Sequence, residues 1–258
     1  MSSGRVHLAI NEGIASILID RPEARNAMTW SMYDELARIC TEIGNDPAVR
    51  VATFRGAGGE AFVAGTDIEQ FRTFGGGEDG IEYEKTIDER IGQIERLPMP
   101  TVALVDGWAI GGGLAITAAC DFRIATPKAS FGIPIARTLG NCLSIANTAR
   151  VLAAFGIGRT KRMLILGETI DADEAKACGF VTEIAAADEL DARANALCER
   201  LLKNAPVTMR VSKEGIRRVV NEGLPQGDDL IRACYGSRDF KIGVEAFLEK
   251  KRPVWTGS

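Results

Sequence analysis

The chain has 258 residues, of which 46% are hydrophobic and 26% are charged, and its formal net charge at pH 7 is −4. These values are ordinary for a globular protein that buries its own core, and the mild acidic excess excludes a broad basic surface for nucleic acid or an anionic membrane. The single histidine, His7, lies near the N-terminus, so neither a histidine-based triad nor a histidine-rich zinc site is expected.

The first elements are a hairpin and a helix. Residues 6–10 and 14–19 are two strand-like runs, and the turn sequence Asn11-Glu12-Gly13 joins them. Apolar residues then recur at helical spacing over residues 32–43, with Ser31 as the expected N-cap.

Alternating strands and helices follow. Buried strands are predicted over residues 49–54 and 101–105, and a helix over residues 81–97. The alternation continues to about Ile184, which favours an α/β fold. Beyond it the pattern is helical, ending in a last helix predicted over residues 240–251.

The cysteines and the apolar runs bear on the compartment. The six cysteines are widely spaced and form no C-x-x-C pair, which favours reduced thiols that fill core space. No apolar run is long enough to span a membrane, and no signal-like segment occurs at the N-terminus. A cytoplasmic location is therefore expected.

Two glycine-containing turns interrupt this pattern. One is the segment 61–71, where Gly65 permits a sharp turn, and the other is the run Gly111–Gly113 before an apolar helix. A capped strand-to-helix turn and tight helix–strand packing would explain them locally. Alternatively, free N–H groups of both turns form a pair of donors that stabilises an enolate oxygen.

Several short motifs occur in a specific order and spacing, and together they make the chain resemble the crotonase (enoyl-CoA hydratase/isomerase) superfamily from end to end. They are Arg21-Pro22 through Asn26-Ala27, Ala64-Gly65-Thr66-Asp67-Ile68, Asp106 through Gly113, Cys120-Asp121, Ala129-Ser130-Phe131-Gly132-Ile133-Pro134, Gly167 through Ala172, and Arg238-Asp239 through Leu248.

The resemblance implies an α/β fold. A spiral core of ββα turns would span residues 1–195, and a C-terminal helical trimerisation region would span residues 196–258. It also implies a homotrimer or a dimer of trimers, with neither nucleic acid nor membrane as a partner.

The resemblance further implies an acyl-CoA thioester substrate and no cofactor besides the coenzyme A that this substrate carries. The oxyanion hole would be the N–H groups of Thr66 and Gly112. Positions implied in CoA binding are Arg25, Ala27, Ala64, Asp67, Ile68, and Lys250 or Lys251.

The chain departs from the resemblance at both catalytic glutamates. The first corresponds to Ala115, and the second to Ile135, or to Ala136 if a one-residue insertion is placed differently. None of these side chains can move a proton, and a positioned acid or base contributes about 10²–10⁴-fold to a rate. Hydration by two carboxylates is therefore not expected, nor is isomerisation by a single glutamate.

Polar residues that follow the position of the second glutamate are candidates for a different set of catalytic residues. Arg137 can hold an anion, Asn141 can orient a water or carbonyl, and Cys142 can act as an acid or nucleophile. Ser144 is a further candidate. Structural alternatives are a salt bridge for Arg137, a helix cap for Asn141 and packing for Cys142.

Two functions remain open from the sequence. The first is an enzyme of the enoyl-CoA hydratase/isomerase type that stabilises an enolate, with hydration, isomerisation, decarboxylation or hydrolysis as its reaction. The second is a non-catalytic acyl-CoA-binding or assembly protein, which the missing glutamates favour.

Overall fold

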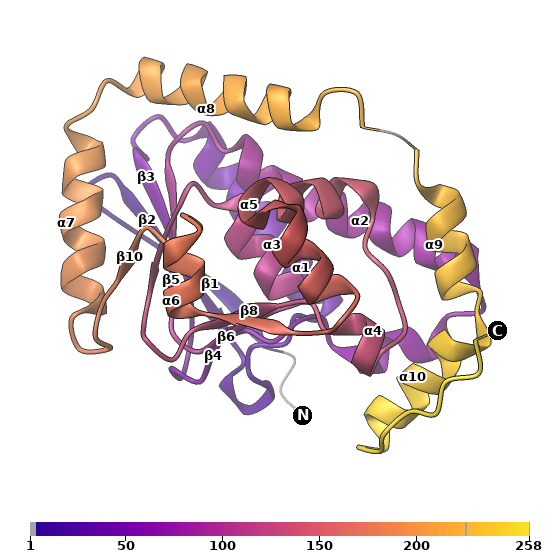
Figure 1. Cartoon of the computed structure of the whole chain (residues 1–258). Helices are drawn as coiled ribbons and strands as arrows, with labels where there is room; N and C mark the ends of the chain where they lie inside the picture. Colours follow the sequence, from indigo (N-terminus) through magenta and orange to yellow (C-terminus); the bar gives the residue numbers. More distant parts are fainter. Residues whose placement is uncertain (1–3, 225, 258) are drawn as a thin grey trace.

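A computed structural model describes residues 4–224 and 226–257. In this part of the chain, helices surround a larger and a smaller sheet (Figure 1). The larger sheet is ordered β1 (Arg5–Asn11), β2 (Ile14–Asp20), β3 (Val51–Gly56), β5 (Thr101–Val105), β7 (Phe122–Ala125) and β10 (Glu183–Ile184). The smaller is ordered β4 (Ala61–Val63), β6 (Trp108–Ile110), β8 (Ser130–Gly132) and β9 (Thr169–Asp171).

The core repeats one unit three times. In each of the pairs β3–β4, β5–β6 and β7–β8, the first strand joins the larger sheet and the second joins the smaller, always parallel to its counterparts. Helical segments follow each pair. They are η2 (Ile68–Thr73) with α2 (Gly77–Arg96), then α3 (Gly112–Ala119), then α4 (Ile135–Thr138) with α5 (Ile145–Leu164). This repetition confirms the α/β spiral that the resemblance implied.

The N-terminal elements follow the sequence prediction closely. Strands β1 and β2 pair antiparallel, and Glu12 and Gly13 turn between them with positive φ angles. Helix α1 (Trp30–Asn45) buries its apolar stripe, including Met32, Leu36 and Ile43. Its N-cap is Thr29 rather than the predicted Ser31, because the Thr29 hydroxyl accepts a hydrogen bond from Met32 N at 3.3 Å.

Helices cover both faces of the larger sheet, and neighbouring residues of a strand pack against different helices because they point to opposite faces. Ala103 packs in the core with helices α1 and α3, whereas Val102 packs with α7 (Leu190–Leu202) on the other face. The predicted boundary between residues 195 and 196 lies inside α7, and the outer ends of both predicted ranges lie outside the described residues.

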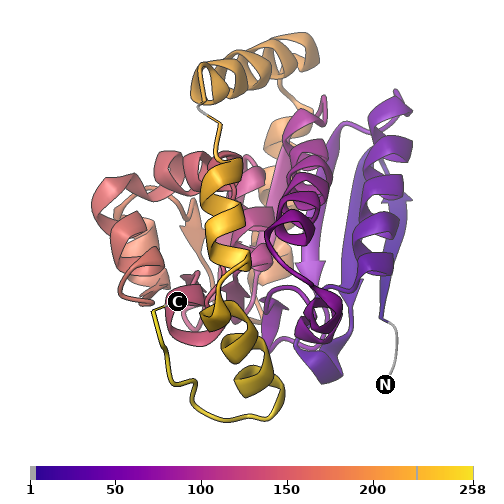
Figure 2. The ribbon, with the colours of Figure 1, turned by 90° about the vertical axis from the view of Figure 1, so that its right-hand side faces the viewer.

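The remaining C-terminal helices confirm the helical character of this region. Helix α8 (Pro206–Asn221) begins at a proline and crosses one end of the molecule, and none of its residues is buried (Figure 1). Helices α9 (Asp228–Tyr235) and α10 (Arg238–Leu248) descend along α2 and η2 (Figure 2). Of the helices described, none has the length and apolar character that crossing a bilayer requires.

Candidate functional site

Two backbone turns meet at the ends of adjacent strands. Strands β4 and β6 are parallel neighbours, so the turns that follow them leave the same edge of the smaller sheet. Gly111 has φ 55°, and a Cβ placed on it would lie 3.6 Å from the Gly65 Cα. A Cβ on Gly113 would collide with the Val63 carbonyl oxygen. The glycines therefore allow the two backbones to approach closely.

Thr66 and Gly112 face each other across this junction. A Cβ on Gly112 would lie 3.6 Å from the Thr66 hydroxyl and 2.5 Å from that of Tyr33. Gly112 is the first residue of α3, where a backbone N–H has no partner inside the helix. Within the described residues, neither the Thr66 N–H nor the Gly112 N–H donates a hydrogen bond. The junction thus presents two neighbouring donors.

Two tyrosines fix the Thr66 side chain. The hydroxyl of Tyr33, on α1, lies 3.0 Å from the Thr66 hydroxyl, and that of Tyr83, on α2, lies 3.1 Å from it. Burial raises the pKa of Tyr33 to about 12, so its hydroxyl is neutral at physiological pH. The two phenols hold Thr66 without introducing a charge.

Residues 25–28 run alongside the first turn. Ala64 N donates to the Arg25 carbonyl at 3.0 Å, and Met28 N donates to the Gly65 carbonyl at 2.8 Å. The buried Asn26 anchors this segment, since its amide donates to the Ala61 carbonyl at 2.8 Å. The chain therefore brings together four of the positions that the resemblance implied in CoA binding, namely Arg25, Ala27, Ala64 and Asp67.

The charged residues among these positions already have partners. Asp67 pairs with the buried Arg21 at 2.8 Å and caps η2, which begins at Ile68. Arg25 donates to Glu60 at 2.6 Å and lies over the Trp108 ring. Lys250, by contrast, lies two residues beyond the end of α10, so the last helix is shorter than predicted.

An aromatic cluster extends from this junction toward the C-terminal helices. Its rings are in mutual contact: Tyr83 lies 4.9 Å from Phe71 and 6.1 Å from Tyr235 between centroids. The cluster comprises Trp30, Tyr33, Phe71, Phe74, Tyr83, Tyr235 and Phe240. Thr66 lies at one of its polar ends, and the hydroxyl of Tyr235 forms another.

A buried carboxyl group that was not predicted from the sequence lies at that second end. Glu84, on α2, is 3% exposed and accepts hydrogen bonds from the Tyr235 hydroxyl at 2.6 Å and from Ser144 N at 3.0 Å. Burial raises its pKa to about 8. The spacing of Glu84 in the sequence indicates its burial, because Glu84 shares the buried face of α2 with Ile81, Ile87 and other isoleucines.

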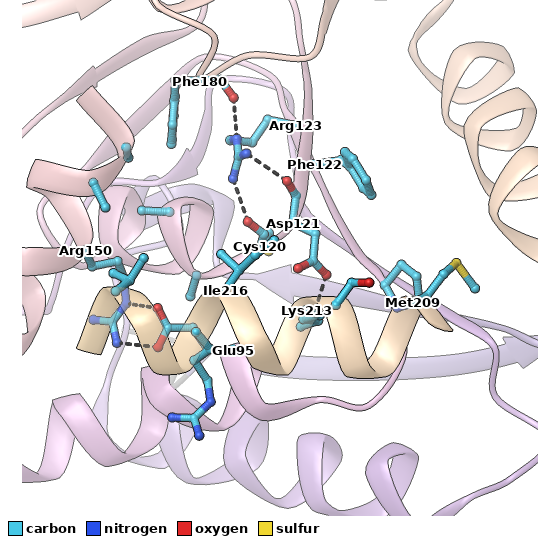
Figure 3. Close-up of a pocket in the computed structure, with 18 of the residues that line it drawn as sticks. Glu95, Cys120, Asp121, Phe122, Arg123, Arg150, Phe180, Met209, Lys213 and Ile216 are labelled. Atoms are coloured by element: carbon cyan, nitrogen blue, oxygen red, sulfur yellow. Dashed lines mark hydrogen bonds and ion pairs between the residues drawn. The ribbon is translucent and has the colours of Figure 1, made fainter. Parts of the chain in front are cut away.

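A cavity of about 920 Å³ in the described part of the chain lies elsewhere. Figure 3 shows it between α8 and the C-terminal end of α3, the end opposite Gly112. Four of its charged residues form two ion pairs, Asp121 with Lys213 at 2.7 Å and Glu95 with Arg150 at 2.6 Å. Asp121 also accepts from Thr101, in keeping with a structural role.

Comparisons with known proteins identify the family of the chain. Residues 9–258 match the sequence model of the family "Enoyl-CoA hydratase/isomerase". Enoyl-CoA isomerase/hydratase fer4 of Mycosarcoma maydis is 32% identical, over 95% of this chain and 93% of that protein. Crotonyl-CoA hydratase of Syntrophomonas wolfei is 31% identical, over 98% of each. A crystal structure of methylmalonyl-CoA decarboxylase complexed with 2S-carboxypropyl CoA matches 100% of both chains, with a TM-score of 0.89 and 25% identity. The chain belongs to the crotonase (enoyl-CoA hydratase/isomerase) superfamily.

The positions at which the resemblance implied catalytic glutamates carry aliphatic side chains. Ala115 is buried within α3, and Ile135 is the first residue of α4, packed against the core. Ala136 is exposed. Under either placement of the one-residue insertion, the side chain at the position of the second glutamate has no ionisable proton.

The four polar candidates for this crotonase-type site do not form one cluster. Arg137 is exposed on α4, near Gly167. Asn141 donates to the Tyr235 hydroxyl at 3.2 Å, and the Cys142 thiol lies against that of Cys234. The structural alternative of a helix cap at Asn141 is wrong, because Ser144 caps α5 and accepts from Asn147 N at 3.0 Å.

Proposed function

We propose that this protein catalyses a reaction of an acyl-CoA thioester through an oxyanion-stabilised enolate. The N–H groups of Thr66 and Gly112 would bind the thioester oxygen and stabilise the negative charge that develops on it. The observation that carries this proposal is the convergence of the two turns, which leaves both donors free beside a fixed hydroxyl.

The coenzyme A would lie along the paired segments around residues 25–28 and 64–68. Arg25, Ala27, Ala64, Asp67 and Ile68 are the proposed contacts, with Lys250 near the phosphates. The pairing of these segments supports the proposal, as does the CoA derivative named for the related decarboxylase structure.

Decarboxylation of a 2-carboxyacyl-CoA is the reaction that the side chains favour. Loss of CO₂ leaves the bonding electron pair on carbon 2 as an enolate, so no general base is required and a proton donor completes the reaction. Ala115 and Ile135 supply no base, whereas the donor pair is in place. The likeness to methylmalonyl-CoA decarboxylase over the full chain supports this choice.

We further propose that the protein assembles as a homotrimer, alone or stacked in pairs. The amphipathic helix α8 supports an association, because Val207, Val211 and Val219 are 62%, 60% and 74% exposed on it. Apolar side chains this exposed on one helix are typical of an interface between subunits.

Replacement of Gly112 by proline tests the enolate proposal, since proline removes one donor and is tolerated at the first position of a helix. The Tyr33→Phe background accommodates the added side chain, because the hydroxyl it would meet is absent. Gly112→Ala in the same background adds the Cβ but keeps the N–H. We expect turnover of a 2-carboxyacyl-CoA to be about 10²–10³-fold lower with proline than with alanine.

The alternative function is a non-catalytic acyl-CoA-binding protein. Binding of acyl-CoA by the wild type without turnover of any thioester in a panel of saturated, 2-enoyl, 3-enoyl, 3-hydroxy, malonyl-type and aromatic derivatives would favour it. Equal turnover by the alanine and proline variants would contradict the assigned role of the Gly112 N–H.

A further inference from the structure

Glu84 is an unusual group for the position it occupies. A buried carboxylate is normally paired with a cation or held by several donors. Within the described residues no lysine or arginine forms an ion pair with Glu84, and its two partners are the Tyr235 hydroxyl and the Ser144 N–H. The neighbouring Lys85 instead pairs with Asp228 at 3.7 Å.

Burial and the nearby negative charge of Asp88 favour the neutral form of Glu84, against its two hydrogen bonds. Asp88 adds a negative charge near it and itself accepts hydrogen bonds from Ser144 and Asn147. Arg150, the cation that acts on Asp88, is itself paired with Glu95. The titratable neighbours that act on Glu84 or respond to its charge come from α1, α2, the segment before α5, and α9; they are Tyr33, Tyr83, Asp88, Cys142, Cys234 and Tyr235.

Burial is the main reason that the pKa of Glu84 rises to about 8, with Asp88 adding to the rise and the two hydrogen bonds opposing it. The carboxyl group therefore holds a proton at pH 7. Its O–H can donate along the 2.6 Å contact to the Tyr235 oxygen, which frees the Tyr235 proton for another acceptor.

The proton lies at the edge of the same aromatic cluster as the donor pair. Tyr83 precedes Glu84 on α2 and reaches Thr66 with its hydroxyl, while its ring packs against Tyr235. The Asn141 amide oxygen beside Tyr235 is buried and has no hydrogen-bond partner within the described residues. An unpaired buried acceptor is costly, so this end of the cluster is suited to a substrate or water that completes it.

We propose that Glu84 is the proton reservoir of this site and acts through Tyr235 to protonate the enolate. This inference rests on the proposed function. Carbon 2 of the enolate takes the Tyr235 hydroxyl proton, and its electron pair becomes the new C–H bond. The Tyr235 oxygen takes the Glu84 proton, which leaves a carboxylate that water protonates before the next turnover. Glu84 thus takes over the acid role that Ala115 and Ile135 cannot perform.

The first test measures the protonation state of the Glu84 carboxyl group directly and does not require turnover. Infrared spectra of the intact protein with carbon-13-labelled glutamate are compared between the wild type and Glu84→Gln. We expect a protonated carboxyl band at pH 7 that disappears as the pH rises through about 8 and is absent from the variant. An ionised Glu84 at pH 7 would overturn the inference whether or not the protein turns over acyl-CoA.

The second test measures turnover of a 2-carboxyacyl-CoA against pH. In the wild type, kcat should fall as the pH rises through about 8, where Glu84 loses its proton. Glu84→Gln should lower kcat by about 10²-fold with little change in KM and should abolish this alkaline limb. The matched control is Glu82→Gln, an exposed glutamate on the same helix, which should match the wild type.

Tyr235→Phe keeps the ring but removes the hydroxyl that lowers the pKa of Glu84, so its residual activity should show the alkaline limb at higher pH. If Tyr235 had a purely structural role, the alkaline limb of the Tyr235→Phe variant would lie at the same pH as in the wild type. One contrary result is turnover that depends on the Gly112 N–H, with the wild-type kcat and alkaline limb retained in Glu84→Gln. This result would refute the role of Glu84 as the proton reservoir and leave the proposed function standing. Turnover that does not depend on Gly112 would refute the proposed function instead.

Discussion

Single residues of the site differ in how visible they are in the sequence. Gly65 and Gly111 could be predicted as turns, because glycine is costly inside regular elements and its presence there needs a reason. Glu84 could not be assigned a role, since its partners Ser144 and Tyr235 are 60 and 151 residues away along the chain. Only its place in the apolar register of α2 indicated that it is buried.

Glu84 should make the stability of the protein depend on pH. Its pKa is about 8 when folded and about 4.5 when unfolded, so between these values the native state holds a proton that the unfolded state lacks. Stability from this group is complete below pH 4.5 and is lost as the pH rises through 8, at about 1.4 kcal/mol per pH unit in between. Glu84→Gln does not titrate.

Chemical denaturation of the wild type and Glu84→Gln from pH 5 to 9 measures this effect. The free energy of unfolding of the wild type should fall relative to that of the variant up to about pH 8 and then remain parallel to it. A constant difference across the whole range would show that Glu84 is ionised in the folded protein.

Element boundaries were predicted less accurately than the elements themselves. Helix α1 was expected with Ser31 as its N-cap, and Asn141 was an alternative cap for the helix that follows it, but the N-caps of α1 and α5 are Thr29 and Ser144. Several residues with capping side chains precede each helix, and the sequence does not show which of them adopts the extended backbone that a cap requires.

Paired alanine substitutions test the cap of α1. Thr29→Ala should lower the free energy of unfolding by about 1 kcal/mol, because the Met32 N–H loses its acceptor. The exposed Ser31→Ala, two residues later, should change it by less than about 0.5 kcal/mol. The reverse order in thermal or chemical unfolding would place the cap where the sequence pattern suggested it.

At the scale of the whole molecule, the alternation of strands and helices predicted an α/β fold, and the family resemblance predicted the ββα spiral. The position of α8 could not be predicted in this way. Its amphipathic pattern indicates that a face is buried, yet the pattern does not distinguish the chain's own core from another subunit. In the structure the valines of this face are exposed.

Lysine substitutions on α8 test the proposed assembly. Val211→Lys with Val219→Lys should convert a trimer to monomers in sedimentation velocity, because two charges would be buried at the interface. Val254→Lys, at a valine that is 79% exposed outside α8, should leave the mass unchanged. A wild-type protein that sediments as a monomer at all concentrations would refute the trimer.

Deuterium incorporation tests the enolate most directly. The wild-type protein is incubated in D₂O with a 2-carboxyacyl-CoA, and the product is analysed by mass spectrometry and proton NMR. We expect release of CO₂ and one deuterium on carbon 2 of the product, with turnover that depends on the Gly112 N–H. Conversion that leaves carbon 2 without deuterium, such as simple hydrolysis of the thioester, would contradict an enolate held by Thr66 and Gly112.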